Sequence, residues 1–223
     1  MWPRILPFAV YMGFIAFSSM LAMFLPTGDQ SQALELWLYP VKVLVVGGLL
    51  VFFWSRFEEL KSPMVENLTE GLSIVGIGVL VYVLWVRMDW SWAIQGEMIG
   101  YNPFAFEHDR SVAMALVGGR LFGASIVVPV MEELFWRSFL IRWIIDNRFN
   151  VVPLGTFTLG SFAATVVLFG LEHNLWLAGM MAGALYNALL YRTRRLWPCI
   201  LAHGLTNFML GIHVLVTEEW QWW

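Results

Sequence analysis

Polar side chains interrupt three otherwise hydrophobic segments in the second half of the chain. A charged group at the centre of a membrane helix costs about 2.5–3.5 kcal/mol on insertion scales. Three such groups in one segment cost on the order of 8 kcal/mol before they pair, so we expect them to have a compensating role. The interrupting residues are Glu132, Glu133 and Arg137 in the first segment, Glu172, His173 and Asn174 in the second, and His203 and Asn207 in the third.

The spacing of these residues predicts which side chains share a helix face. Glu133 and Arg137 are four residues apart, so they can pair on one face. Glu132 points about 100° around the helix and is free to face a cavity. His203 and Asn207 have the same four-residue spacing on the last segment. Each segment therefore offers one polar face.

Depth in the membrane favours convergence of these faces. Glu132 lies ten residues before Arg142, which is roughly 15 Å along a helix. His203 lies eight residues after Arg195, or roughly 12 Å. His173 is at the tip of a hairpin whose arms reach roughly 18–24 Å, less than a hydrocarbon core of about 30 Å. Unless the hairpin spans fully, its tip is expected inside the membrane, near the other groups.

This set of residue types suits hydrolysis without a covalent intermediate. A carboxylate base together with a histidine can hold and deprotonate a water molecule. A histidine and an asparagine can donate hydrogen bonds to the oxyanion that forms when a peptide carbonyl is attacked. No serine or cysteine nucleophile stands out, and Cys199 stands alone, which excludes an intrachain disulfide and a thiolate metal cluster. The pattern indicates a peptide hydrolase.

The composition places these residues in a membrane protein. Of the 223 residues, 59% are hydrophobic and only 13% are charged, about half the share of a soluble domain. The formal net charge of -3 gives no basic footprint for nucleic acid. We therefore predict one integral membrane domain over residues 1–223, surrounded by the lipid bilayer of a cell membrane, with no nucleic-acid partner.

Hydropathy predicts an all-α, polytopic transmembrane bundle. Helices are expected because lipid offers the backbone no hydrogen-bond partners. Splitting the fourth segment at Pro129 would change seven membrane helices to eight. The catalytic helical core is expected over 111–216. The predicted segments are 5–25, 37–54, 72–86, 111–141, 160–171, 176–191 and 197–216.

Loop charge predicts the orientation. Basic loops stay in the cytoplasm, so the N-terminus is expected inside and the C-terminus outside. The basic loop residues that fall on one side of the predicted membrane topology are Arg4, Arg56, Lys61, Arg142, Arg148, Arg192, Arg194 and Arg195. The other collects Asp29, Glu35, Asp89, Glu97, Glu107, Asp109, Glu218 and Glu219, with Arg87 and Arg110 near its boundary.

Three motifs resemble those of the CAAX-protease and bacteriocin-processing (CPBP) family of intramembrane endopeptidases. Glu132-Glu133-Leu-Phe-Trp-Arg137 resembles its EExxxR motif. Phe169-Gly-Leu-Glu-His173 resembles FxxxH, and His203-Gly-Leu-Thr-Asn207 resembles HxxxN. The resemblance implies a helical membrane fold with a polar cavity that faces the cytoplasm. It also implies residue roles: Glu132 and His173 activate water, Glu133 and Arg137 support them, and His203 and Asn207 stabilise the oxyanion.

Two earlier segments, 37–46 and 100–106, resemble the CAAX-protease-related branch found with bacterial exosortase systems. This implies a bacterial inner-membrane protein that acts on a membrane-associated peptide or protein, with an exosortase-type system as partner. One departure is Glu172, where the family more usually has a small residue. Glu172 either perturbs His173 or faces outward at the hairpin tip.

Three other functions compete with an endopeptidase. A catalytically silent scaffold could bind a partner or peptide in the same cavity. A zinc-dependent protease would use His173, His203 and Glu132 as ligands, but the HExxH pattern of a zinc protease is missing. A proton-coupled transporter would show repeated halves, whereas here the polar residues sit only in the second half. No cofactor is therefore expected, and zinc is the alternative.

Overall fold

The computed structural model describes residues 1–22, 29–96, 98 and 100–223, and within them it is helical without strands. The longer helices are α1 (Trp2–Ala22), α2 (Asp29–Phe52), α3 (Leu68–Trp85), α8 (Leu159–Leu171), α9 (Trp176–Thr193) and α10 (Trp197–Thr217). The shorter ones are α4 (Pro103–Phe106), α5 (Arg110–Phe122), α6 (Val128–Glu133) and α7 (Ile141–Ile145). The expected all-α fold is confirmed.

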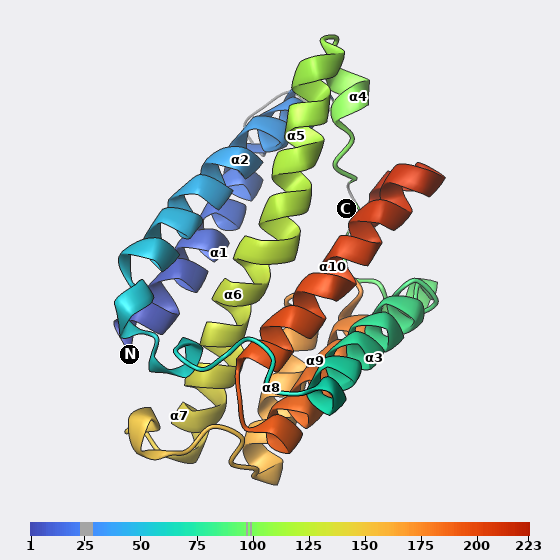
Figure 1. The fold of residues 1–223 in the computed structure, drawn as a ribbon. Coiled ribbons are helices and arrows are strands. Elements are labelled where there is room, and N and C mark those ends of the chain that lie inside the picture. The colour runs from blue at the N-terminus through green and yellow to red at the C-terminus, as the bar shows by residue number, and fades with distance from the viewer. Residues whose placement is uncertain (23–28, 97, 99) are drawn as a thin grey trace.

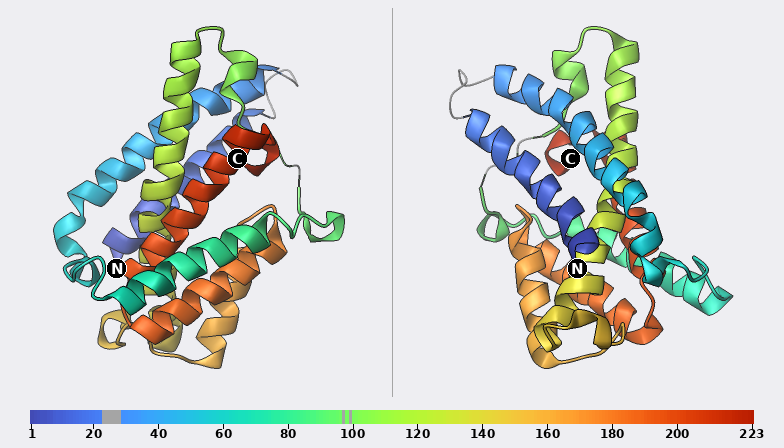
Figure 2. Two further views of the ribbon diagram at one scale, coloured as in Figure 1. Left: turned by 45° about the vertical axis from the view of Figure 1, so that its right-hand side comes forward. Right: turned by 90° about the vertical axis from the view of Figure 1, so that its left-hand side faces the viewer.

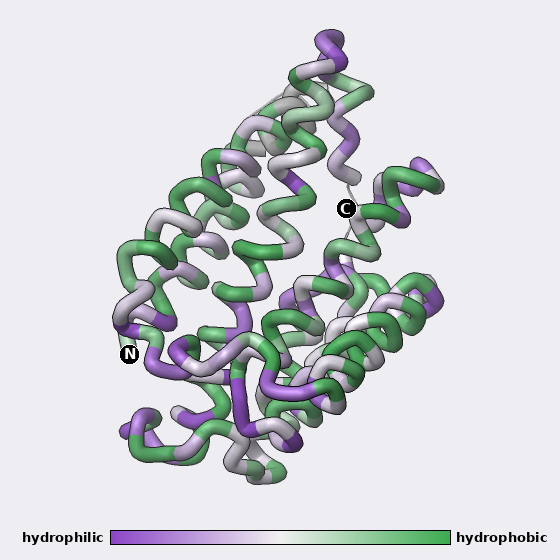
Figure 3. Tube along the Cα trace, viewed as in Figure 1, coloured by the Kyte–Doolittle hydropathy of each residue, from purple (hydrophilic) through white to green (hydrophobic). Residues whose placement is uncertain are grey.

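Among the described residues, four helices are long and apolar enough to cross a membrane: Trp2–Leu21, Leu68–Trp85, Arg110–Ile145 and Trp197–Thr217. The stretches Leu36–Phe52 and Leu159–Leu171 are apolar but shorter. The chain is therefore a polytopic helical bundle. In Figure 3 the hydrophobic colour dominates the long helices, while hydrophilic residues gather in the connections and within the long helix near α6. A total of seven crossings stays a prediction, since an eighth requires a division of the chain at Pro129.

Residues 110–145 form one continuous helix, so the chain is not divided at Pro129. Two wider π-helical turns, Gly123–Val127 and Leu134–Leu140, join α5, α6 and α7. The first turn directly precedes Pro129, whose ring lacks the N–H that a regular helix needs and crowds the preceding turn. A wider turn relieves that conflict, which explains why the proline does not break the helix.

The long helix stands between two groups of helices (Figures 1 and 2). On one side α1 packs against α2, and on the other α8 packs against α9 and α3 against α10. The long helix takes part in both hydrophobic clusters, with Met131 buried in the first and Trp136 in the second. It diverges from α10 towards the end that carries α4 (Figure 1).

Ion pairs close the opposite end of the bundle, where the basic loops lie. Arg4 at the start of α1 pairs with Glu59 at 2.5 Å, and Ser138 of the long helix donates a hydrogen bond to the same carboxylate. Arg195, in the turn between α9 and α10, pairs with Glu70 of α3 at 2.7 Å. These contacts fix the helix ends that must hold the site.

Candidate active site

Glu133, Arg137 and His203 form one buried network. Arg137 Nη1 donates to Glu133 Oε1 over 3.2 Å, as the four-residue spacing predicts. The Nδ1 of His203, on α10, lies 2.9 Å from the same oxygen. Glu133 and Arg137 are 0% and 1% exposed, so neither charge is screened by solvent. The network therefore joins α10 rigidly to the long helix.

Two further elements hold the Arg137 guanidinium. Its Nε donates to Asn187 Oδ1 at 3.1 Å, and its Nη2 donates to the carbonyl of Gly183 at 3.3 Å, both on α9. The guanidinium also lies 4.4 Å from the centre of the Phe169 ring on α8. Asn187 was not identified from the sequence. The signal was a lone amide inside an apolar segment, four residues after Gly183.

Glu132 points away from this network, as expected from its place on the helix. Its side chain is buried, and its Oε2 lies 4.0 Å from His203 Nε2. This distance is too long for a direct hydrogen bond but suits two groups that share one water molecule. Within the described part of the chain, Glu132 Oε2 has no hydrogen-bond partner.

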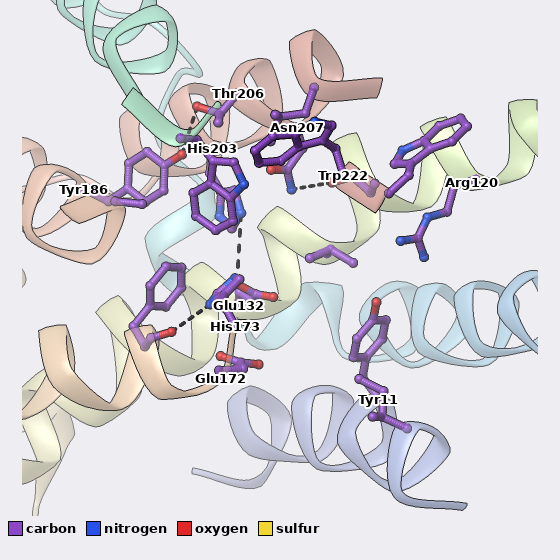
Figure 4. Close-up of a pocket in the computed structure, with 18 of the residues that line it drawn as sticks. Tyr11, Arg120, Glu132, Glu172, His173, Tyr186, His203, Thr206, Asn207 and Trp222 are labelled. Carbon is purple, nitrogen blue, oxygen red and sulfur yellow. Dashed lines mark hydrogen bonds and ion pairs between the residues drawn. The ribbon is translucent and has the colours of Figure 1, made fainter. Parts of the chain in front are cut away.

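His173 reaches the same cavity from the tip of the α8–α9 hairpin (Figure 4). The two arms of the hairpin, α8 with 13 residues and α9 with 18, extend roughly 20 Å and 27 Å. A tip that ends inside the membrane stays a prediction. His173 Nδ1 lies 2.7 Å from the carbonyl oxygen of Phe169. A carbonyl only accepts, so Nδ1 carries the proton and Nε2 keeps its lone pair. Gln95 donates to two carbonyls at the tip, those of Leu171 and His173.

Asn207 lies one turn beyond His203 on α10 and lines the cavity. Its Nδ2 donates to the carbonyl of Ala124 at 2.9 Å, in the first wide turn of the long helix. The two helices come this close because Gly204 has no side chain: a Cβ there would meet the Ser125 oxygen at 2.6 Å. The amide has a second N–H, which leaves it one further donor.

Glu172 also lines the cavity, which decides between the two alternatives left by the sequence. It does not face outward, because Trp136 Nε1 of the long helix donates to Glu172 Oε2 at 3.1 Å. Figure 4 shows Glu172 beside His173 and Glu132. The cavity thus contains two carboxylates and two histidines.

The cavity has a volume of about 260 Å³ and extends to one side of Glu132. Its lining runs from Glu132 back to Arg120 along the long helix, and from His203 on to Leu210 along α10. Both runs lead away from the basic loops (Figure 1). The cavity therefore lies on the side of Glu132 that is away from the basic loops, and the face of the membrane to which it opens stays a prediction.

The arrangement gives no support to a zinc site. Within the described residues, no group of three or more histidine, cysteine, aspartate or glutamate side chains could hold a metal ion.

One family model matches the chain. Residues 110–209 match the model described as "Type II CAAX prenyl endopeptidase Rce1-like". The match supports the CAAX-protease family. The matched stretch contains all six predicted site residues, Glu132, Glu133, Arg137, His173, His203 and Asn207. No curated protein and no solved structure matches the chain.

Proposed function

We propose that the chain is an intramembrane endopeptidase that hydrolyses a peptide bond of a membrane-associated substrate. The observation that carries the proposal is the geometry at Glu132: a buried carboxylate oxygen without a hydrogen-bond partner in the described part of the chain, in one cavity with His173 and His203. An uncompensated acid in a membrane helix is a functional group by default. The family match supports the same activity.

In the proposed reaction, Glu132 and the free Nε2 of His173 hold a water molecule. Glu132 takes one proton as the water oxygen attacks the carbonyl carbon of the peptide. The charge that develops on the carbonyl oxygen accepts hydrogen bonds from Asn207 and from Nε2 of His203 in its imidazolium form, in which both ring nitrogens carry protons. The C–N bond then breaks, and Glu132 returns its proton to the leaving amine.

Glu133 and Arg137 position these groups and do not react. Glu133 holds Nδ1 of His203, which fixes the direction of Nε2. Arg137 holds Glu133 and contacts the ring of Phe169, the residue whose carbonyl orients His173. A single buried guanidinium thereby couples both histidines.

The substitution Glu132→Gln tests the proposal. Glutamine keeps the size and polarity of the side chain but cannot accept a proton from water, so cleavage should fall by about 10²–10⁴-fold. Membranes of cells that express the wild type or the variant are compared by mass spectrometry, and peptides that shorten only with the wild type are the products. Equal cleavage by a folded, inserted Glu132→Gln protein would remove Glu132 as the base.

The two competing functions predict different outcomes, one in this experiment and one when a chelator is added. A silent scaffold yields no wild-type product, and its partner still binds Glu132→Gln. A zinc-dependent protease loses activity in a strong chelator, whereas hydrolysis by Glu132 alone does not.

We also propose that the substrate belongs to an exosortase-type system in a bacterial inner membrane. Two segments, 37–46 and 100–106, carry that resemblance and lie side by side: the rings of Tyr39 and Tyr101 are 5.6 Å apart, and Tyr101 Oη donates to the carbonyl of Leu36. Tyr39 lines the cavity of the site, which links this resemblance to substrate binding. Co-expression with candidate substrates from such a system tests this, and cleavage of unrelated membrane peptides alone would contradict it.

A further inference from the structure

Arg120 is a cation inside the membrane bundle that the proposed reaction does not use. It lies on the long helix and lines the cavity of the site. Its guanidinium is 4.2 Å from the centre of the Tyr39 ring and 5.1 Å from that of Tyr101. Among the residues that the structure describes, no carboxylate forms an ion pair with it, and its buried Nε has no hydrogen-bond partner.

Aromatic stacking compensates only part of the cost of such a charge. An arginine inside a membrane helix carries an insertion cost, and aromatic rings attract its charge without supplying a counter-charge. Burial raises the pKa of Tyr101 to about 12, so its phenol is neutral at ordinary pH and supplies no counter-charge. The planar fork of an arginine matches a carboxylate or a phosphate, which would supply that charge.

A second cavity of about 390 Å³ continues from the first at this point, and both are lined by Tyr11, Tyr39 and Arg120. Lys42 lines the second cavity, with its Nζ 4.1 Å from the centre of the Tyr11 ring. None of the described side chains that line this second cavity is acidic. An anion placed here meets the positive charge of Arg120.

The separation of Arg120 and Glu132 along the long helix determines how many substrate residues can lie between them. The two residues are twelve apart on one helix, so their backbones are roughly 18 Å apart along its axis. The arginine side chain shortens this distance, and an extended peptide covers about 3.3–3.6 Å per residue. Three to five substrate residues therefore bridge the two points. Figure 4 shows Arg120 and Tyr11 across the cavity from Glu172 and His173.

We propose that Arg120 binds a carboxylate of the substrate peptide, three to five residues from the bond that is cleaved. This rests on the proposed endopeptidase function and adds a specificity-determining residue to it. The carboxylate is a side chain or a chain terminus, and both present the same chemistry to the guanidinium. Arg120 takes no part in proton transfer.

Binding of blocked peptides to the full chain in nanodiscs tests the proposal. The probes are apolar octapeptides, acetylated and amidated, in which one glutamate moves along the sequence, each with a glutamine partner. A further pair differs only in a free or amidated C-terminus. The Glu132→Gln background keeps the peptides intact. A charge-assisted hydrogen bond corresponds to roughly 10- to 100-fold in affinity, so one glutamate position or the free terminus should bind that much more tightly than its neutral partner.

Three variants assign the effect to Arg120. Arg120→Gln should abolish the preference, and Arg120→Lys should keep part of it, because a lysine retains the charge but not the fork. Arg110→Gln is the matched control: it removes the same charge from an exposed position at the start of the same helix, and the preference should survive. If Arg120→Gln fails to fold, the comparison of Arg120→Lys with wild type still decides.

Two results overturn the proposal. Equal binding of the charged and neutral members of every pair by the folded protein with Arg120 intact shows that Arg120 does not recognise a carboxylate. A preference that disappears when phosphatidylglycerol replaces phosphatidylcholine in the nanodisc, with Arg120-dependent binding of that lipid, assigns Arg120 to a lipid phosphate instead. Failure of the endopeptidase function is a separate result, since it appears as absence of cleavage by wild type and leaves the binding measurements intact.

Discussion

The two halves of the long helix differ in whether their buried polar groups have hydrogen-bond partners. Towards the basic loops, Ser138 and Arg142 are buried and fully engaged: Arg142 donates to the backbone and the hydroxyl of Ser138, which also contacts Glu59. Towards the other end, Glu132 and Arg120 each have a buried polar atom without a partner in the described part of the chain.

This difference separates structural from functional charge. The satisfied groups lie where three chain segments meet and hold them together. Glu132 and Arg120 border the cavity, where a bound water or substrate can compensate them. Glu133 lies between the two regions and shares both properties: its Oε1 is held by Arg137 and His203, whereas its buried Oε2 has no hydrogen-bond partner in the described part of the chain.

The largest effect on stability is expected for Glu133→Gln. The change leaves Arg137 buried without its counter-ion, and loss of one partner of a buried pair costs about 3–5 kcal/mol. Thermal unfolding in detergent measures the loss, and activity should fall with it. Glu58→Gln is the matched control, because the Lys61–Glu58 pair is solvent-exposed and should contribute less than about 1 kcal/mol. Equal effects of the two changes would contradict the comparison.

Asn207→Ala should act on turnover and leave the fold intact. The variant removes one hydrogen bond to the Ala124 carbonyl and the proposed oxyanion donor. Loss of such a donor lowers kcat by about 10²–10³-fold. Kinetics on a cleaved peptide, with melting temperature as the control for folding, check the prediction. A proportionate loss of stability with an unchanged kcat would assign Asn207 to helix packing alone.

The end of the bundle that carries the basic loops should lose stability in acid because Glu59 becomes protonated. Burial raises the pKa of this carboxyl, but hydrogen bonds from Arg4 and Ser138 outweigh burial, and the net shift is downward. A depressed folded pKa stabilises the protein above the unfolded pKa of about 4.3, and this stability is lost as pH falls through the folded value. Wild type should therefore lose more stability than Glu59→Gln below pH about 4 in detergent melts. Parallel pH profiles would exclude this role.

The smallest perturbation tests which region faces the cytoplasm. The basic loops at 55–61, 142–148 and 192–195 are predicted to be cytoplasmic. Arg192→Cys is exposed and should change stability by no more than about 0.5 kcal/mol. An impermeant thiol reagent should label it only after the cells are opened, while the buried Cys199 serves as the unlabelled background. Labelling in intact cells would reverse the orientation and place the cavity on the cytoplasmic side of the site.

The sequence by itself determined the fold class and predicted the residues of the candidate site. Hydropathy located most helix ends to within four residues, because lipid leaves the backbone little choice but a helix. The exception is α2, which begins at Asp29, eight residues before the predicted segment 37–54, and residues 23–25 of the first predicted segment lie outside the described residues. The four-residue spacing of Glu133 and Arg137 determined their pairing, since neighbours on a helix face meet whatever surrounds them. The three motifs named the six residues that the structure brings to one region.

Only the tertiary structure decided the long-range partners. The bond from Asn187 to Arg137 and that from Trp136 to Glu172 join residues far apart in the chain, and no local spacing encodes them. Gln95, which lies on another segment, donates to two carbonyls at the hairpin tip, and no local spacing encodes that contact either. Above all, the long helix, α10 and the α8–α9 hairpin together line the cavity, so only their packing brings Glu132, His173 and His203 to one space.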